Sequence, residues 1–137
     1  MKKLISLIVP LFVLVSCQGR EQKEITHNYH EIKSKLIDWV DVFEQEEHNY
    51  IIYFYSENCG HCNSIKNEVI SYYLETTENM YFVCTDLDVV FGSGNVIGIN
   101  NIDDFFILGT PFLVRILEYV VSEYYAGTNA ILEFINN

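Results

Sequence analysis

Residues 50–62 read YIIYFYSENCGHC, a dense apolar and aromatic run that ends in two cysteines three positions apart. Residues 50–55 have the length and the β-branched and aromatic composition of a strand. They do not alternate between apolar and polar side chains, which is typical of a strand buried on both faces. The polar residues 56–58 then lead into the tetrad CGHC at 59–62. The pattern predicts a central strand that is followed by a C-x-x-C pair.

A helical pattern and a second strand follow the tetrad. Ile65, Val69, Tyr72 and Tyr73 recur at the spacing of one helix face. Residues 80–84 (MYFVC) have the composition of another strand. A strand, a helix and a strand in this order predict a parallel βαβ unit with a right-handed crossover.

The segments on either side of this unit are less regular. Apolar residues at three- and four-residue spacing predict one helix between residues 29 and 43. Residues 86–109 contain a candidate short helix at 103–106. The rest of that segment is predicted to be a loop, because it holds three glycines, Gly92, Gly94 and Gly98.

The C-terminal part predicts a hairpin and a last helix. Residues 112–117 and 120–125 look like strands, and the short turn between them permits only antiparallel pairing. Gly127 and Thr128 offer a break and an N-cap for a helix over 129–135. The expected fold class is therefore α/β, with a central mixed β-sheet flanked by helices.

The first 16 residues have the character of an export signal. A basic start is followed by an apolar run from Leu4 to Val15, which is shorter than the roughly 20 residues that span a bilayer and has the length of a signal-peptide core. The sequence Leu-Val-Ser-Cys that ends at Cys17 resembles the lipobox of bacterial lipoproteins, which implies lipidation of Cys17 after cleavage. An ordinary secretory signal with an incidental cysteine is the alternative. Residues 17–28 are interpreted as a polar tether, and residues 29–137 as one domain.

The charge of the chain limits its partners. Eight Lys and Arg stand against 19 Asp and Glu, for a formal net charge of -11. Phosphate backbones are bound by Lys and Arg, so no nucleic-acid partner is expected. The predicted location is a cell membrane, with the protein held by its lipid anchor and facing away from the cytoplasm. Export would place the C-x-x-C pair where disulfides form and persist.

The C-x-x-C pair fits thiol–disulfide exchange. The reacting species is a thiolate, and unpaired N–H groups at the first turn of a helix would stabilise a negative sulfur on Cys59. Gly60 permits a tight turn, and His61 adds positive character. Cys62 lies nearly one helical turn on, where it can attack a mixed disulfide and release the substrate. Cys59 is therefore predicted to be the exposed nucleophile and Cys62 the shielded, resolving thiol.

Other roles for the cysteines fit the sequence less well. A zinc site needs four ligands and no second C-x-x-C exists, so no metal is expected. A c-type haem needs His after the second cysteine, where Asn63 stands. An inert structural bridge is disfavoured because so small a loop gains little stability from it. Cys84, inside an apolar strand, is interpreted as a small buried hydrophobic residue.

The order of these elements, the tetrad and a Thr-Pro before the hairpin resemble the thioredoxin superfamily over residues 29–137. The tetrad itself is similar to that of protein disulfide isomerase domains. The resemblance implies that Pro111 is cis and faces the C-x-x-C, and that Thr110 offers backbone groups to an extended substrate peptide. The family's first strand has no clear counterpart before Tyr29 and is expected to be missing.

The chain also departs from the family's pattern. Tyr53 stands where members often have a buried acid that moves the proton of the resolving thiol. Asn58 replaces the common tryptophan before the first cysteine, and Asn67 replaces the proline five residues after the second. These departures concern the efficiency of reduction more than the fold.

The sequence thus predicts an extracytoplasmic, lipid-anchored thiol–disulfide oxidoreductase. Its expected partners are protein thiols and disulfides and a membrane redox partner, and its redox group is the Cys59–Cys62 disulfide without a further cofactor. A redox-inactive lipoprotein of the same fold that binds peptides or assists secretion is the alternative. The histidine in the tetrad favours oxidation or isomerisation, and the unknown reducing partner leaves the direction open.

Overall fold

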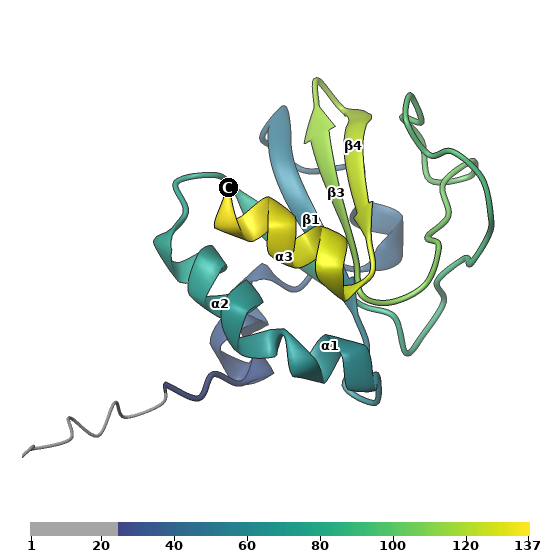
Figure 1. Cartoon of the computed structure of the whole chain (residues 1–137). Coiled ribbons are helices and arrows are strands. Elements are labelled where there is room, and N and C mark those ends of the chain that lie inside the picture. The colour runs from purple at the N-terminus through teal and green to yellow at the C-terminus, as the bar shows by residue number, and fades with distance from the viewer. Residues whose placement is uncertain (1–24) are drawn as a thin grey trace, which may run out of the picture.

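The computed structural model describes residues 25–137. The predicted signal segment and Cys17 lie outside the described residues. The helices and strands, in chain order, are η1 (Tyr29–Lys35), η2 (Trp39–Asp41), β1 (Asn49–Tyr55), α1 (Gly60–Ser64), α2 (Lys66–Glu75), β2 (Met80–Cys84), β3 (Phe112–Leu117), β4 (Val120–Ala126) and α3 (Thr128–Asn136) (Figure 1). No helix between residues 25 and 137 combines the length and the apolar character that crossing a bilayer requires.

Four strands form one mixed sheet in the order β2-β1-β3-β4. Strand β1 pairs with β2 in parallel, with Tyr53 opposite Phe82, and with β3 antiparallel, with Tyr53 opposite Leu113. Every residue of β1 after Asn49 is buried. The predicted α/β fold, the central position of residues 50–55 and the parallel βαβ unit are confirmed.

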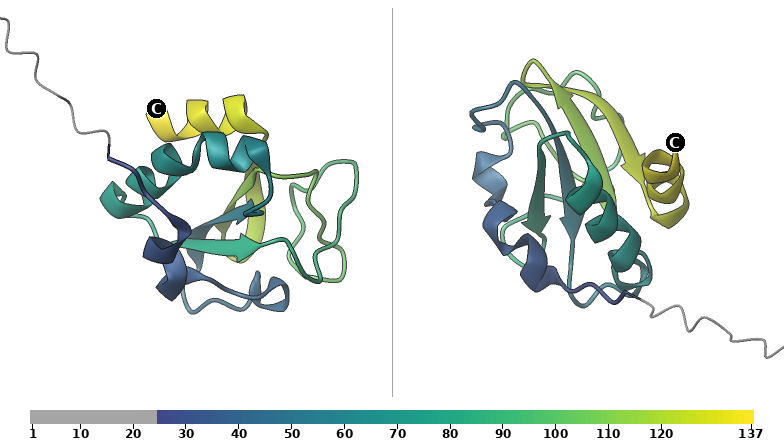
Figure 2. Two further views of the ribbon diagram at one scale, coloured as in Figure 1. Left: turned by 90° about the horizontal axis from the view of Figure 1, so that it is seen from below. Right: turned by 90° about the vertical axis from the view of Figure 1, so that its left-hand side faces the viewer.

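Both faces of the sheet are covered, and by different kinds of segment. Helices α1, α2 and α3 and the helix η1 contribute Cys62, Val69, Ile131 and Ile32 to the core on one face. Figure 2 shows α2 and α3 side by side, and the Tyr72 and Phe134 rings meet edge to face between them. The other face is covered by residues around η2 and by the long connection between β2 and β3. This division explains why β1 has no polar face.

The single helix predicted between residues 29 and 43 is wrong. The chain forms two short 3₁₀ helices instead, and it is extended at Leu36 (φ -71°, ψ 130°). Ile32 packs into the core on one face of the sheet, whereas Trp39 packs into the core on the other. One continuous helix cannot serve both faces, so the chain has to pass around the edge of the sheet between these two residues.

The segment that crosses this edge also shows what the chain has near the expected gap, where the family's first strand has no clear counterpart in the sequence. Leu36 makes a single parallel bridge to Phe82 of β2, and the Ile37 N–H donates to the Phe82 carbonyl at 2.9 Å. Within residues 25–137, this one bridge is the only pairing on the outer edge of β2. The edge is therefore marked by one bridge and lacks a full strand.

The C-terminal hairpin follows the prediction, with one difference at the helix that comes after it. Glu118 and Tyr119 form the turn, both with positive φ (51° and 62°), and β3 and β4 pair antiparallel. The last helix begins at Thr128, and its N-cap is Gly127, with φ 85°. The prediction of Thr128 as the cap is wrong, because the chain needs a left-handed conformation there that glycine adopts without steric cost.

Residues 85–111 connect β2 to β3 without a helix or a strand of their own. The short helix predicted at 103–106 is wrong: the segment is a turn, in which the Asp104 N–H donates to the Asn101 side chain at 3.0 Å. The loop around it was predicted correctly. Phe105 anchors this loop, because it is 1% exposed and its ring lies 5.2 Å from the Trp39 ring and 5.8 Å from the Phe54 ring.

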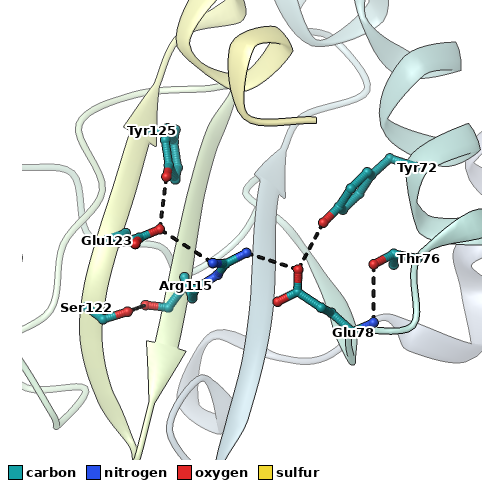
Figure 3. Close-up of polar contacts among 7 residues, drawn as sticks. All are labelled: Tyr72, Thr76, Glu78, Arg115, Ser122, Glu123 and Tyr125. Atoms are coloured by element: carbon teal, nitrogen blue, oxygen red, sulfur yellow. Dashed lines mark hydrogen bonds and ion pairs between the residues drawn. The ribbon is translucent and has the colours of Figure 1, made fainter. Parts of the chain in front are cut away.

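A polar network ties the hairpin of β3 and β4 to the connection before β2 (Figure 3). Arg115 of β3 lies 3.0 Å from the carboxylate of Glu78 and 3.8 Å from that of Glu123 on β4. The Tyr72 hydroxyl donates to Glu78 at 3.2 Å, and the Tyr125 hydroxyl donates to Glu123 at 2.9 Å. The network therefore links α2, β3 and β4 through one guanidinium group.

Removing the Phe105 ring should cost much of the stability of the fold. We expect Phe105→Ala to lower the free energy of unfolding by about 3–5 kcal/mol, because it leaves a cavity between the rings of Trp39, Phe43 and Phe54. The matched control is Phe91→Ala in the same loop, where the ring is 57% exposed and the loss should stay below about 1 kcal/mol. Urea unfolding measures both. Equal losses would show that Phe105 does not anchor the loop.

Candidate active site

The segment after β1 is folded so that Cys59 begins a helix. The Cys59 N–H donates to the Ser56 carbonyl at 3.2 Å, and the Asn63 side chain donates to the Glu57 carbonyl at 2.9 Å. Cys59 has extended dihedral angles (φ -86°, ψ 113°) and is the N-cap of α1. Its sulfur takes the place of the oxygen with which Ser, Asp or Asn caps a helix.

Cys59 and Cys62 are joined as a disulfide, with their Cα atoms 5.2 Å apart. The Cys62 N–H donates to the Cys59 Sγ at 3.1 Å. Cys59 is partly exposed, whereas Cys62 is completely buried. Gly60 and His61, between them, are exposed. An incoming sulfur atom can therefore approach Cys59 and not Cys62.

The Thr-Pro pair that directly precedes β3 lies against this disulfide. The peptide bond between Thr110 and Pro111 is cis, as the resemblance implied. The Thr110 carbonyl oxygen is 3.6 Å from Cys59 Sγ, and because a disulfide sulfur carries no proton this is a contact and not a hydrogen bond. Thr110 is partly exposed and Pro111 is buried. Thr110, which is 51 positions from Cys59 in the sequence, thus lies on the same surface as the reacting pair.

The position of the family's buried acid is occupied by a neutral group. Tyr53 is completely buried, and its hydroxyl has no hydrogen-bond partner among the described residues. Burial, followed by the neighbouring hydroxyls of Tyr29 and Tyr55, raises the pKa of Tyr53 well above its ordinary value. Tyr53 is therefore un-ionised at neutral pH and does not supply a carboxylate at this position.

The interpretation of Cys84 as a buried hydrophobic residue needs correction. Cys84 ends β2 and is only half-buried, because the chain leaves the sheet directly after it. Its thiol donates to the Asp86 carboxylate at 3.2 Å, and Asp86 also accepts from the Ser56 hydroxyl at 2.5 Å. Burial, and then the Asp86 carboxylate, raise the pKa of the Cys84 thiol.

Asp86 was given no role from the sequence, although it links two segments of the site. Through its hydrogen bond with Ser56, Asp86 joins the segment that follows β2 to the segment that carries Cys59. The signal that could have found it is positional: Ser56 and Asp86 each follow a predicted parallel strand within two residues. The ends of adjacent parallel strands meet at the same edge of a sheet.

No cluster of three or more potential metal ligands occurs between residues 25 and 137. The structure brings Cys59, Cys62, Thr110 and Pro111 together, with Gly60 and His61 exposed between the two cysteines. The arrangement offers one accessible sulfur, one shielded sulfur and an adjacent stretch of backbone. It can exchange disulfides with the thiols of a partner.

Comparison with known proteins agrees with this arrangement. The thioredoxin family model matches residues 30–111, and no curated protein matches the chain. The structure of mitochondrial thioredoxin 3 from Saccharomyces cerevisiae, in its oxidised form, is 13% identical with a TM-score of 0.53, and the match covers 77% of this chain and 97% of that one. Thioredoxin f2 from Chlamydomonas reinhardtii is 14% identical with a TM-score of 0.48, over 74% of this chain and 92% of that one.

The structural likeness at such low identity concerns the fold, while the family match extends from η1 to the cis proline and includes both cysteines of the disulfide. With its C-x-x-C disulfide at the start of a helix, the chain belongs to the thioredoxin family.

Proposed function

We propose that this protein is a lipid-anchored, extracytoplasmic thiol–disulfide oxidoreductase that acts on protein disulfides through Cys59 as nucleophile and Cys62 as resolving thiol. The observation that carries the proposal is the difference in accessibility within the disulfide. Cys59 is partly exposed beside Thr110, whereas Cys62 is completely buried. Exchange needs one sulfur that a partner can reach and one that only its neighbour can reach.

The exchange runs through a mixed disulfide in both directions. In reduction, the Cys59 thiolate attacks a substrate disulfide and releases one substrate thiol. Cys62 then loses its proton and attacks Cys59 Sγ, which releases the second substrate thiol and leaves the Cys59–Cys62 disulfide. In oxidation, a substrate thiolate attacks Cys59 Sγ and displaces Cys62, and a second substrate thiolate then releases Cys59. Two electrons and two protons move between the partners in each cycle.

The surroundings of Cys59 support its role as the attacking thiolate in reduction and as the leaving thiolate in oxidation. The Cys62 N–H that it accepts at 3.1 Å also stabilises the thiolate after reduction, because N–H groups at a helix start favour negative charge. The exposed His61 adds positive character when protonated. Stabilising the reduced form raises the potential, about -180 mV in protein disulfide isomerase against about -270 mV in thioredoxin. The tetrad therefore favours the oxidising or isomerising direction.

The location rests on the N-terminal sequence. Lipidation at Cys17 would hold the domain at a membrane by acyl chains, each buried CH₂ contributing about 0.8 kcal/mol. The net charge of -11 adds no attraction to anionic headgroups. A membrane redox partner that restores the Cys59–Cys62 pair after each cycle completes the proposal, and its own potential sets the direction of the flow of electrons.

Substitution of the accessible cysteine should abolish catalysis. Cys59→Ser is expected to reduce insulin-disulfide reduction to the background rate, whereas Cys84→Ser should leave it unchanged because Cys84 takes no part in the exchange. Retained activity in Cys59→Ser would contradict the proposal. No activity above background in the unsubstituted protein, with peptide binding the same in it and in Cys59→Ser, would identify a redox-inactive binding protein.

The three thiols of the described region should differ in reactivity after reduction. At neutral pH, Cys59 is expected to react with iodoacetamide faster than free cysteine, because the thiolate is the nucleophile. Cys84 should react more slowly than free cysteine, since its raised pKa leaves less thiolate, and its rate should increase as the pH rises towards that pKa. Mass spectrometry of time-resolved alkylation gives the individual rates. A Cys59 no faster than Cys84 would be incompatible with its assigned role.

Removal of the resolving thiol should trap the intermediate. We expect Cys62→Ser to accumulate mixed disulfides with substrate proteins, which appear on non-reducing gels and disappear with dithiothreitol. The control is the double variant Cys59→Ser with Cys62→Ser, which should trap nothing. Adducts that persist in the double variant would assign the captured substrate to Cys84.

The anchor can be tested separately from the chemistry. Cys17→Ser should move the protein from the membrane fraction to the soluble fraction and stop its labelling with radioactive palmitate, while activity on insulin stays the same. Unchanged membrane association together with unchanged labelling would show that Cys17 carries no lipid. The unsubstituted protein, treated in parallel, is the control.

A further inference from the structure

A groove outside the reacting pair lies on the outer edge of β2. Its walls are residues 36–40 on one side and the segment from Cys84 to Asp88 on the other, and it encloses about 470 Å³. The two walls are held together at the bridge between Leu36 and Phe82. Beyond that bridge the two segments separate and line the cavity. The groove therefore opens at the end of β2, where the edge of the sheet is uncovered.

The backbone of β2 is available at this edge. The Phe82 carbonyl points outward, because it accepts the Ile37 N–H, whereas the Thr85 N–H points inward to Tyr55 of β1. Alternate residues of a strand direct their N–H and C=O groups to opposite edges. Cys84, two residues after Phe82, therefore directs its backbone groups into the groove, where no segment of residues 25–137 pairs with this edge beyond Ile37. An unpaired edge is a template for another strand.

The side chains around the edge combine apolar surface with negative charge. Leu36, Val40 and Leu87 are exposed by 40%, 61% and 78%, and Trp39 forms part of the lining. The charged residues that line the cavity are all acidic: Asp38, Asp86 and Asp88. All three are exposed at the surface. Lys and Arg are absent from the lining.

We propose that this groove binds an extended basic peptide segment, with Lys or Arg alternating with apolar residues, that adds to the outer edge of β2 as a further strand. Its alternate apolar side chains contact Leu36, Val40 and Leu87, and its basic side chains lie near the three aspartates. Strand addition obtains affinity from main-chain hydrogen bonds and specificity from alternate side chains.

The charge of the chain decides between this occupant and a second copy of the same protein. A second copy carries a net charge of -11 and would bring negative charge to an acidic groove, which is unfavourable. A basic segment of another protein gains attraction at the same place. Peptide binding at this groove does not require exchange at Cys59, because neither Cys59 nor Cys62 lines the groove.

Trp39 provides a direct readout of binding. It is the only tryptophan of the chain, so its emission reports the groove when tyrosine is not excited. The probe is a blocked lysine–valine alternating hexapeptide, titrated into the oxidised full-length protein at low salt. We expect saturable binding that weakens as salt is added. The matched glutamate–valine peptide should not bind. N-methylation of every second residue should abolish binding in the register whose N–H groups face β2 and should leave binding in the other register.

Two conservative variants test the charges without disturbing the fold. Asp38→Asn combined with Asp88→Asn should weaken binding of the lysine–valine peptide about fivefold or more at low salt. Asp88 has φ 54°, which asparagine also tolerates, and the Asp38 side chain makes no capping hydrogen bond. The control is Glu68→Gln combined with Glu75→Gln on α2, which removes the same charge and should leave binding unchanged. Circular dichroism verifies that all variants are folded.

Several results would overturn the proposal. These are equal binding of the glutamate–valine peptide, full binding by both N-methylated peptides, and equal weakening by the two pairs of variants. A further such result would come from sedimentation. If the unsubstituted protein is a dimer that binds no peptide, and Leu87→Ser dissociates it, the groove belongs to a second copy.

Discussion

The burial of β1 on both faces is the constraint on which the rest of the molecule depends. Strand β1 pairs with β2 on one side and β3 on the other, and its residues after Asn49 are all enclosed. A strand in that position can move little, because the packed layers above and below it leave no room. The segment that leaves its end is therefore delivered to a fixed place. Cys59 follows four residues later, as the cap of α1.

The second part of the site is held by the same strand. Strand β3 begins at Phe112, which lies opposite Phe54 near the end of β1. The cis peptide bond before Pro111 therefore reaches the level of Cys59 because the register of β1 and β3 brings it there. Thr110 and Cys59 come from distant parts of the chain, and their contact at 3.6 Å is a consequence of strand pairing. Strand pairing thus brings the two parts of the site together.

Much of this could be predicted from the sequence, since the signals were local. Residues 50–55 showed a run too apolar for a half-exposed strand, and the hairpin and the C-x-x-C were visible at short range. The path of residues 29–43 could not be predicted, because the spacing of Ile32, Leu36 and Trp39 fits a helix and also fits two turns that serve opposite faces of the sheet. Only the position of the sheet edge distinguishes the two.

The site residues also divide into those that a local pattern identifies and those that depend on contacts between distant parts of the sequence. Cys59 and Cys62 were identifiable because three-residue spacing at a strand–helix junction is a local pattern. The link from Asp86 to Ser56 was not, since it joins residues 30 positions apart and depends on the adjacency of β1 and β2. The half-buried state of Cys84 was missed for a related reason: composition indicates that a strand is buried but does not show where the chain leaves it.

In the function proposed for this chain, the net charge of the protein and the unpaired edge of β2 act over different distances. The net charge of -11 produces a field that extends about a Debye length, roughly 8 Å at physiological ionic strength, beyond the surface. It therefore favours the encounter with basic partners over acidic ones before any contact is made. The groove at β2 then acts at contact distance, while Ser56 and Asp86 connect its wall to the segment that carries Cys59. Recognition and exchange can accordingly be separate in space and still belong to one end of the sheet.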